Sequence, residues 1–266
     1  MFESGEKIKT IAIVSAKGGV GKTTIAATLG LALSRAGHPA LLVDLDPQNA
    51  LRFHLGAESQ AAEAGLARAS LADIPWRETV VRGDAGPYLL PFGQINEADR
   101  LALEQQMRQD DAWLANHLRA LDLEPDTVVL VDTPPGPSIY LSQALRCADL
   151  VLVVTLPDAA SYATLPQVEN LIAQYCEGRP EFLGHAFVVN QADSAAALAK
   201  DTLQVMRGIL ADRLAGVIHR DATVSEALAF GTTVIDHAPH SQASNDIGIS
   251  AQWLLRQLRE PREDQP

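Results

Sequence analysis

The stretch with the most obvious chemistry lies near the N-terminus, where glycines, lysines and hydroxyl side chains follow an apolar run. Residues 11–24 read Ile-Ala-Ile-Val-Ser-Ala-Lys-Gly-Gly-Val-Gly-Lys-Thr-Thr. Glycines let the backbone curl until successive N–H groups point inward at phosphate oxygens. The Lys22 ammonium can reach the β- and γ-phosphates, and the Thr23 hydroxyl can bind Mg²⁺. This order predicts a phosphate-binding loop between a strand and a helix. The residues expected to contact the nucleotide here are Gly18, Gly19, Val20, Gly21, Lys22, Thr23 and Thr24.

Carboxylates follow two apolar runs that have the composition of buried strands. Asp44 and Asp46 come at the end of one such run and just beyond it, and Asp132 ends a second. A carboxylate at such a strand end can hold the water shell of Mg²⁺, and we expect this of Asp132. Residues 134–136, Pro-Pro-Gly, form a bend that could respond to hydrolysis. Asp44 and Asp46 could instead simply start a turn, but a phosphate loop earlier in the chain favours the functional interpretation.

These side chains need a scaffold that brings several strand ends together. Apolar runs alternate with helical stretches along the chain, which predicts a doubly wound α/β fold with a mainly parallel sheet. Ligands bind such sheets at the carboxyl ends of the strands, where each motif lies. We expect one domain over residues 1–266, with flexible tails at 1–8 and 259–266. The expected strands are 9–15, 40–44, 88–92, 127–131, 150–155, 185–189 and 216–219; the expected helices include 22–36, 97–121 and 241–258, with short helical pieces in 50–80.

The composition is that of an ordinary globular protein, with 47% hydrophobic and 20% charged residues. A net charge of −12 argues against a broad basic face, so non-specific binding to DNA is disfavoured. Cys147 and Cys176 are far apart, which predicts reduced cytosolic thiols and argues against a metal cluster. The N-terminus has no signal pattern and no apolar run approaches a membrane span, so we expect a cytoplasmic protein.

The glycine-rich stretch has a specific form, K-G-G-x-G-K-T-T, in which Ala16 replaces the usual first glycine and Lys17 follows it. This form resembles the deviant Walker A loop of the ParA/MinD family of dimeric ATPases, and the resemblance covers nearly the whole chain. It implies a P-loop NTPase fold of the ParA/MinD type, ATP and Mg²⁺ as cofactors, and slow, regulatory ATP hydrolysis. It also implies a homodimer that sandwiches ATP, in which Lys17 contacts the nucleotide of the other subunit.

The same resemblance assigns roles to individual residues. The implied catalytic residues are Lys17, Lys22 and Asp46, and the implied metal ligands are Thr23, Asp46 and Asp132. In this scheme Asp46 positions the attacking water. Asn190 would read the adenine edge from a strand end, and Arg220 would lie in the loop that borders the adenine. The alternatives are that Asn190 is a turn residue and that Arg220 is a solvated surface arginine.

Phrases in the middle of the chain resemble one branch of this family, the cellulose-biosynthesis ATPases of the BcsQ group. The matching phrases are residues 65–71, Trp76 with Arg77, 89–94, 218–221 and 226–229. This likeness implies an accessory, regulatory subunit of the bacterial cellulose synthase complex, and so a part in biofilm formation. The implied partners are a short co-encoded cellulose-biosynthesis protein and the membrane-embedded synthase, which would recruit the ATPase to the inner membrane face or the cell pole. We expect no direct contact with nucleic acid and no membrane insertion.

Two other functions stay open. A ParA-type partition ATPase for chromosomes or plasmids would bind DNA in its ATP state, with strong salt dependence. A non-hydrolysing scaffold would bind ATP and never cycle. The acidic charge balance disfavours the first, and the presence of both Lys17 and Lys22 makes hydrolysis plausible. The last helical stretch has only Arg256 and Arg259 before the chain turns acidic, unlike the basic membrane-binding helix of the cell-division members.

Overall fold

The structure is a computed structural model that describes residues 8–57, 63–82, 86–193 and 195–259. Its strands form one eight-stranded sheet in the order β3-β4-β2-β5-β1-β6-β7-β8. The strands are β1 (Lys9–Val14), β2 (Ala40–Asp44), β3 (Val81–Arg82), β4 (Tyr88–Leu90), β5 (Val128–Asp132), β6 (Leu150–Thr155), β7 (Gly184–Ala192) and β8 (Leu214–His219). The helices are α1 (Lys22–Arg35), α2 (Leu51–His54), α3 (Leu66–Leu71), α4 (Glu97–Gln109), α5 (Trp113–Arg119), α6 (Ile139–Cys147), α7 (Ala159–Cys176), α8 (Ala197–Leu210), α9 (Ala222–Ala229), α10 (Val234–His237) and α11 (Gln242–Arg259). Two short 3₁₀ turns, η1 (Trp76–Glu78) and η2 (Ala211–Arg213), complete them.

The chain winds outward from β1 in both directions. β1 pairs in parallel with β5 on one side and with β6 on the other. Among the described strands only β3 runs antiparallel to its neighbour, β4. The predicted doubly wound, mainly parallel α/β fold is therefore confirmed, and β1 is the point at which the strand order reverses.

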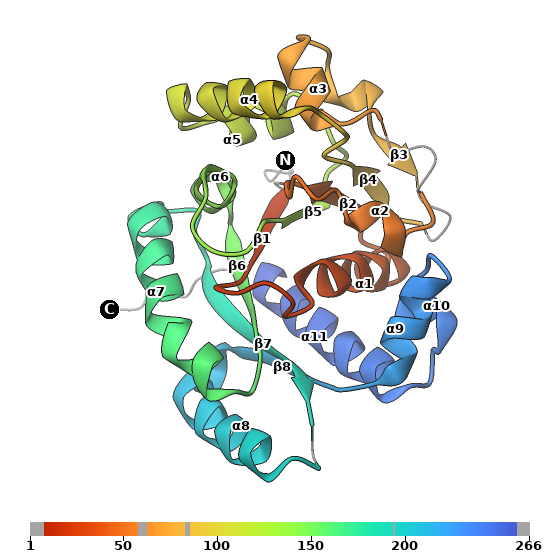
Figure 1. Ribbon diagram of the computed structural model, residues 1–266, viewed down its shortest axis with the longest axis vertical. Coiled ribbons are helices and arrows are strands. Elements are labelled where there is room, and N and C mark those ends of the chain that lie inside the picture. The colour runs from red at the N-terminus through yellow and green to blue at the C-terminus, as the bar shows by residue number, and fades with distance from the viewer. Residues whose placement is uncertain (1–7, 58–62, 83–85, 194, 260–266) are drawn as a thin grey trace, which may run out of the picture.

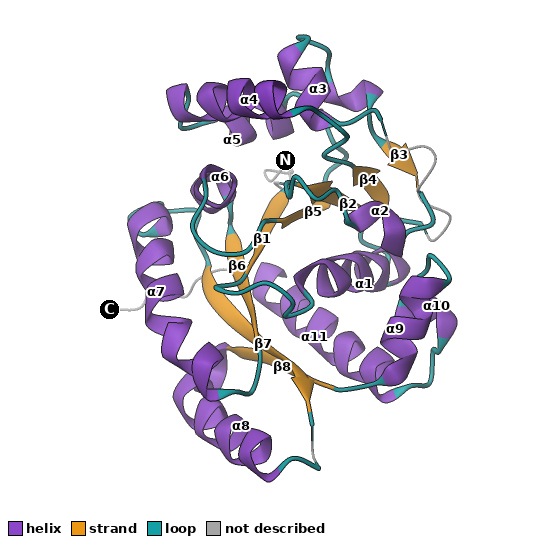
Figure 2. Cartoon of the chain, in the orientation of Figure 1, coloured by secondary structure: helices purple, strands orange, loops and turns teal. Residues whose placement is uncertain are grey.

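The sheet separates two apolar cores. Along β1, Ala12 and Val14 enter one core, whereas Ile11 and Ile13 enter the other, as the two-residue period of a strand requires. Helices α1, α2, α9, α10 and α11 contribute to the core on one face, and α3 to α8 to the core on the opposite face (Figures 1 and 2). Because β2, β5 and β6 are buried along their whole length, they appear in the sequence as unbroken apolar runs.

The prediction of one long helix over residues 97–121 was wrong, because the helix is interrupted between α4 and α5. Asp110 is extended (φ −129°, ψ 104°), and its carboxylate accepts the N–H of Ala112 at 2.8 Å. Gln143 of α6 donates to the carbonyls of Met107 and Asp110 at 2.8 and 2.7 Å. These bonds satisfy carbonyls that a continuous helix would have used, so the break is stabilised from a distant segment.

Other element boundaries differ by a few residues. The strand expected at 88–92 ends at Leu90, before Pro91, and β7 extends past Val189 to Ala192. β3 has only two residues, too few to give a pattern in the sequence. The predicted tails at 1–8 and 259–266 lie outside the described residues apart from Ile8 and Arg259.

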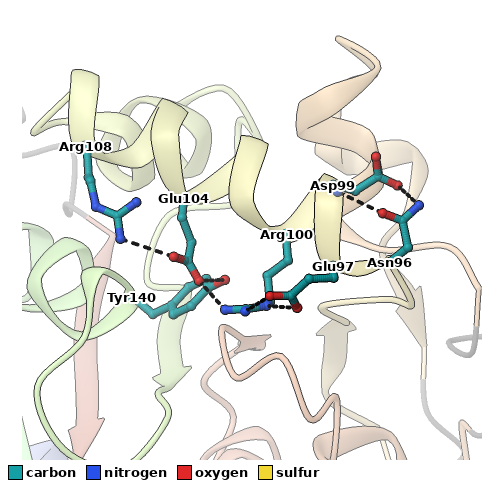
Figure 3. A network of polar contacts seen from close by, with 7 residues as sticks. All are labelled: Asn96, Glu97, Asp99, Arg100, Glu104, Arg108 and Tyr140. Carbon is teal, nitrogen blue, oxygen red and sulfur yellow. Dashed lines mark hydrogen bonds and ion pairs between the residues drawn. The ribbon is translucent and has the colours of Figure 1, made fainter.

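A polar network joins α4 to α6 (Figure 3). Glu104, which is only 8% exposed, accepts hydrogen bonds from Arg100 at 2.6 Å, Arg108 at 3.2 Å and the hydroxyl of Tyr140 at 3.2 Å. Tyr140 is the second residue of α6, the helix that begins directly after the proline-containing bend at 134–137. The network therefore fixes the far side of that bend to the helical layer.

In the described part of the chain, no helix combines the length and the apolar character needed to cross a membrane. The same residues contain no group of three or more His, Cys, Asp or Glu side chains that could hold a metal ion by themselves. Both cysteines are free, and burial raises the pKa of Cys147 to about 12 and that of Cys176 to about 11. Neither thiol is therefore poised to react or to ligate a metal.

Candidate nucleotide-binding site

The loop between β1 and α1 has the geometry that a phosphate requires. Gly19 and Gly21 adopt φ angles of 76° and 89°, which side chains other than glycine rarely tolerate. The first turn of α1 has neither an acidic residue nor a side-chain cap, so its N–H groups and the positive end of its dipole stay available to an anion. Lys22 is only 7% exposed at this helix start. These features suit the loop to phosphate groups.

A cavity of about 970 Å³ extends from this loop to the segment that links β8 and α9. Its volume suits a whole nucleotide. Ten of the predicted site residues line it: Gly18, Gly19, Val20, Gly21, Lys22, Thr23, Thr24, Asp46, Asn190 and Arg220. Two predicted residues, Lys17 and Asp132, lie outside the lining. The fold thus brings most of the predicted residues together at one edge of the sheet.

Asp132 lies beneath the loop at the end of β5 and is 1% exposed. One carboxylate oxygen accepts the hydroxyl of Thr23 at 2.7 Å, and the other, Oδ1, is buried with no hydrogen-bond partner among the residues that the structure describes. Burial raises the pKa of Asp132 to about 6, although the Lys22 charge and the bond from Thr23 oppose the rise. A buried carboxylate with an unused acceptor, beside a hydroxyl, fits the shell of Mg²⁺. Such a site would use phosphate and water ligands in addition to the protein groups.

Asp44 and Asp46 play different structural parts after β2. Asp44 is fully buried, and its carboxylate accepts the N–H groups of Asp46 at 3.1 Å and Leu51 at 3.0 Å. Burial and the nearby Asp132 raise the pKa of Asp44 well above its usual value. Asp46, in contrast, lines the cavity and accepts the N–H of Gln48 at 2.9 Å. Asp44 therefore shapes the loop, while Asp46 faces the space that the nucleotide would occupy.

Lys17 forms an ion pair with Asp158, the N-cap residue of α7, at 3.6 Å. The two side chains are 35% and 47% exposed, so the pair lies on the surface. Although desolvation works against it, hydrogen bonds from Ser161 and the Lys17 charge lower the pKa of Asp158. Lys17 thus lies beside its own phosphate loop and is held away from the cavity.

Asn190 near the end of β7 supports the loop directly. Its amide donates to the carbonyl of Val20 at 2.7 Å. A Cβ atom added at Gly21 would lie 2.4 Å from the same amide nitrogen, so this glycine is required both by its φ angle and by its close neighbour. The side chain of Arg220 is 75% exposed and lies 4.0 Å from the carboxylate of Asp193.

His219 lines the cavity and belongs to residues 217–221, the loop that the family resemblance placed beside the adenine, but the sequence interpretation gave this histidine no role of its own. It ends β8, and its ring Nδ1 lies 2.9 Å from the carboxylate of Asp246 on α11. The two residues are 27 positions apart, so the sequence gives no sign of the pair. Gln191 was also missed: it lines the cavity, and its amide lies 3.3 Å from the carbonyl of Gly19.

Comparisons with known proteins show which family this chain resembles. The family model for "Cellulose biosynthesis protein BcsQ" matches residues 8–255. The chain is 31% identical over 259 residues to the chromosome-partitioning ATPase Soj of Thermus thermophilus, covering 96% of this chain and 98% of that protein. It is 27% identical over 240 residues to the cellulose biosynthesis protein BcsQ of Salmonella typhimurium, covering 90% and 91% of the two chains.

Two solved structures share the fold. The septum site-determining protein MinD of Pyrococcus horikoshii, complexed with Mg-ADP, matches with a TM-score of 0.76 at 21% identity, over 93% of this chain and 96% of that one. Cobyrinic acid a,c-diamide synthase of Mycobacterium smegmatis, with a bound ATP analogue and magnesium, matches with a TM-score of 0.76 at 25% identity, over 97% and 98%. The predicted fold type and the cofactors ATP and Mg²⁺ are thereby confirmed. The chain belongs to the BcsQ family and is a P-loop ATPase of the ParA/MinD type.

Proposed function

We propose that this ATPase is a dimerisation switch that regulates the bacterial cellulose synthase complex as an accessory subunit in the cytoplasm. The match of the BcsQ family model to residues 8–255 carries the proposal. In this view ATP hydrolysis is slow and serves to reset the switch. What matters is that the two nucleotide states bind the synthase and a short co-encoded partner with different affinity. Recruitment to the inner membrane face or the cell pole would follow from that binding, and with it a role in biofilm formation.

The position of Lys17 supports a role between two subunits. Its ammonium is excluded from the cavity of its own chain and is held by Asp158 at the surface. An exposed ion pair of this kind contributes little free energy, so it can give way when a second subunit brings its phosphates close. Two chains would then enclose two ATP molecules, each Lys17 contacting the nucleotide of the other chain.

The hydrolytic roles follow from the cavity. Lys22 and Thr23 would hold the phosphates and Mg²⁺, and Asp46 would position the attacking water in line with the γ-phosphate. Asp132 would complete the magnesium shell through its unused oxygen. The bend at 134–137 lies between the loop and α6, since the N–H of Gly136 donates to the carbonyl of Ser15 at 3.0 Å. Loss of the γ-phosphate would therefore be transmitted to α6.

The test is affinity capture of the Asp46→Ala variant from its own cells with ATP present. Slow hydrolysis in this variant should hold the dimer closed, so cellulose-synthase components should be recovered and identified by mass spectrometry. The Lys22→Ala variant is the matched control, because it should lose ATP binding and with it the captured components. Equal recovery with both variants would mean that nucleotide does not control docking.

Dimerisation has its own test. Lys17→Ala should bind ATP with wild-type affinity by calorimetry yet remain monomeric by light scattering. Asp158→Ala removes the surface partner of Lys17 without touching the cavity, and it should dimerise at least as well as the wild type. A normal ATP-dependent dimer of Lys17→Ala would remove the role of this lysine in the second subunit.

Partition of chromosomes or plasmids is the second candidate, and the 31% identity to Soj favours it. In that case the ATP-bound dimer would bind DNA, and the binding would weaken steeply with salt. The net charge of −12 weighs against it. A gel-shift assay with ATP at low and moderate salt separates the two: ATP-dependent DNA binding, with capture of a centromere-binding protein in place of synthase components, would establish partition.

A further inference from the structure

The cavity has a phosphate end and a remaining wall that must hold the nucleoside. The phosphate end consists of the loop and Asp46. The rest of the wall comes from the ends of β7 and β8, from α9 and the residues before it, and from Ile247 of α11. A nucleotide whose phosphates lie on the loop must place its base against this second part, where His219 is located.

The orientation of the His219 ring is fixed by Asp246. One oxygen of this carboxylate accepts the backbone N–H of His219 at 2.9 Å and lies 2.9 Å from the ring Nδ1. The other oxygen accepts the side-chain amide of Gln242 at 2.8 Å. Asp246 is 6% exposed and is held by three groups, so it cannot turn away from the ring.

This contact decides which ring nitrogen carries the proton. A carboxylate that accepts neighbouring N–H groups acts as an acceptor, so Nδ1 must donate. In the neutral imidazole, Nε2 is then an acceptor on the opposite edge of the ring. No side chain or backbone group in the described ranges bonds to this nitrogen. The His219 side chain is 37% exposed and lines the cavity, so an unused acceptor is available to a base there.

We propose that His219, held in its Nδ1–H form by Asp246, reads the exocyclic amino group of adenine and makes the site select ATP over GTP. Adenine offers a donor at this position, which pairs with the Nε2 lone pair. Guanine offers a carbonyl oxygen, which faces the same lone pair as a second acceptor. His219 is thus a specificity residue, and Asp246 is its positioning residue. The inference rests on the nucleotide site alone and is independent of the cellulose role.

The test compares ATP with purine riboside triphosphate, which lacks the amino group, by isothermal titration calorimetry. The wild type should bind ATP about threefold to tenfold more tightly, the value of one hydrogen bond. In His219→Ala this ratio should fall to about one, while purine riboside triphosphate keeps its affinity because its phosphates are still held. His240→Ala replaces an exposed histidine outside the cavity and should retain the wild-type ratio. An unchanged ratio in His219→Ala would overturn the proposal, even if ATP binding is intact.

The role of Asp246 has a spectroscopic test. In the wild type, the ¹⁵N shifts of the His219 ring should identify Nδ1 as the protonated nitrogen. In Asp246→Ala the two neutral forms should mix, and the ATP preference over purine riboside triphosphate should decline. Finding a proton on Nε2 in the wild type, either alone or together with one on Nδ1, would refute the mechanism, whether or not Asp246→Ala folds.

Discussion

Glu104 on α4 and Asp132 at the end of β5 are both buried carboxylates, and their surroundings differ in charge. Two arginines and a tyrosine hydroxyl satisfy Glu104 (Figure 3). In the described part of the chain, one oxygen of Asp132 accepts a hydrogen bond from the Thr23 hydroxyl and the other accepts none. Asp46 adds further negative charge beside Asp132, and the positive charge of Lys22 opposes it.

The difference separates a structural carboxylate from a functional one. A buried charge is tolerated when opposite charges and hydrogen bonds compensate it, and the Glu104 network does so within the chain. The sheet edge does not do so, and the raised pKa of Asp132 records the deficit. Such a deficit beneath a phosphate-binding loop indicates a site at which a cation would balance the charge. The predictions below test this contrast.

The largest effect is expected at Asp132. Asp132→Asn should lower the rate of ATP hydrolysis by roughly 100-fold, because residues in the outer shell of a metal contribute 10- to 100-fold. The same variant should melt at a higher temperature than the wild type when both lack nucleotide and Mg²⁺ at pH 7.5, since it removes an uncompensated buried charge. A phosphate-release assay measures the rate of hydrolysis, and a thermal melt measures the melting temperature. A lower melting temperature would mean that Asp132 is already satisfied without a cation.

Glu104→Ala should reverse this pattern. It leaves two arginines without their shared acceptor, and we expect a loss of about 2 kcal/mol in the free energy of unfolding by urea. The figure lies below that for a fully buried pair because the arginine side chains are 34% and 57% exposed. ATP affinity should stay within about twofold of the wild type, because Glu104 does not line the cavity. The loss of even one hydrogen bond to the nucleotide would change the affinity by more than that. A matched loss of ATP affinity would instead reveal that the α4–α6 network controls the bend at 134–137.

His54 on α2 allows the effect of burial to be tested on a basic side chain. It is 6% exposed, and burial lowers its pKa from 6.5 to about 4. The unfolded chain therefore takes up a proton at a higher pH than the folded one, so stability is full above pH 6.5 and declines as the pH falls toward 4. As the pH falls from 6.5 to 5, His54 should lower the free energy of unfolding by about 1.5 kcal/mol. In His54→Gln the urea-unfolding free energy should decline less over this interval by that amount, and an equal decline in both proteins would contradict the assignment.

The smallest effect is expected at Glu97, which pairs with Arg100 at 2.6 Å on the exposed side of the Figure 3 network. Its side chain is 70% exposed, and water screens such pairs. Glu97→Ala should therefore leave the melting temperature unchanged within error. A clear decrease would mean that the outer ion pair holds Arg100 in place for Glu104.

The sequence alone predicted most of the sheet and the phosphate loop. Strands β1, β2, β5 and β6 are buried on both faces, so each one appears in the sequence as a continuous apolar run. The loop was predictable because its glycines, its two lysines and its hydroxyls lie within fourteen consecutive residues, 11–24. Backbone conformation and burial of this kind are local properties, and a short stretch of sequence encodes them.

Only the tertiary structure decided the contacts between distant segments. The break at Asp110 depends on Gln143. The position of Lys17 depends on Asp158, and the ring orientation of His219 depends on Asp246. In each pair the residues are separated by between 27 and 141 positions. Such side chains have many possible partners in the unfolded chain, and the packing of helices on the sheet selects one. That is why the sequence by itself indicated a phosphate site, whereas the structure was needed to show which groups hold its residues in place.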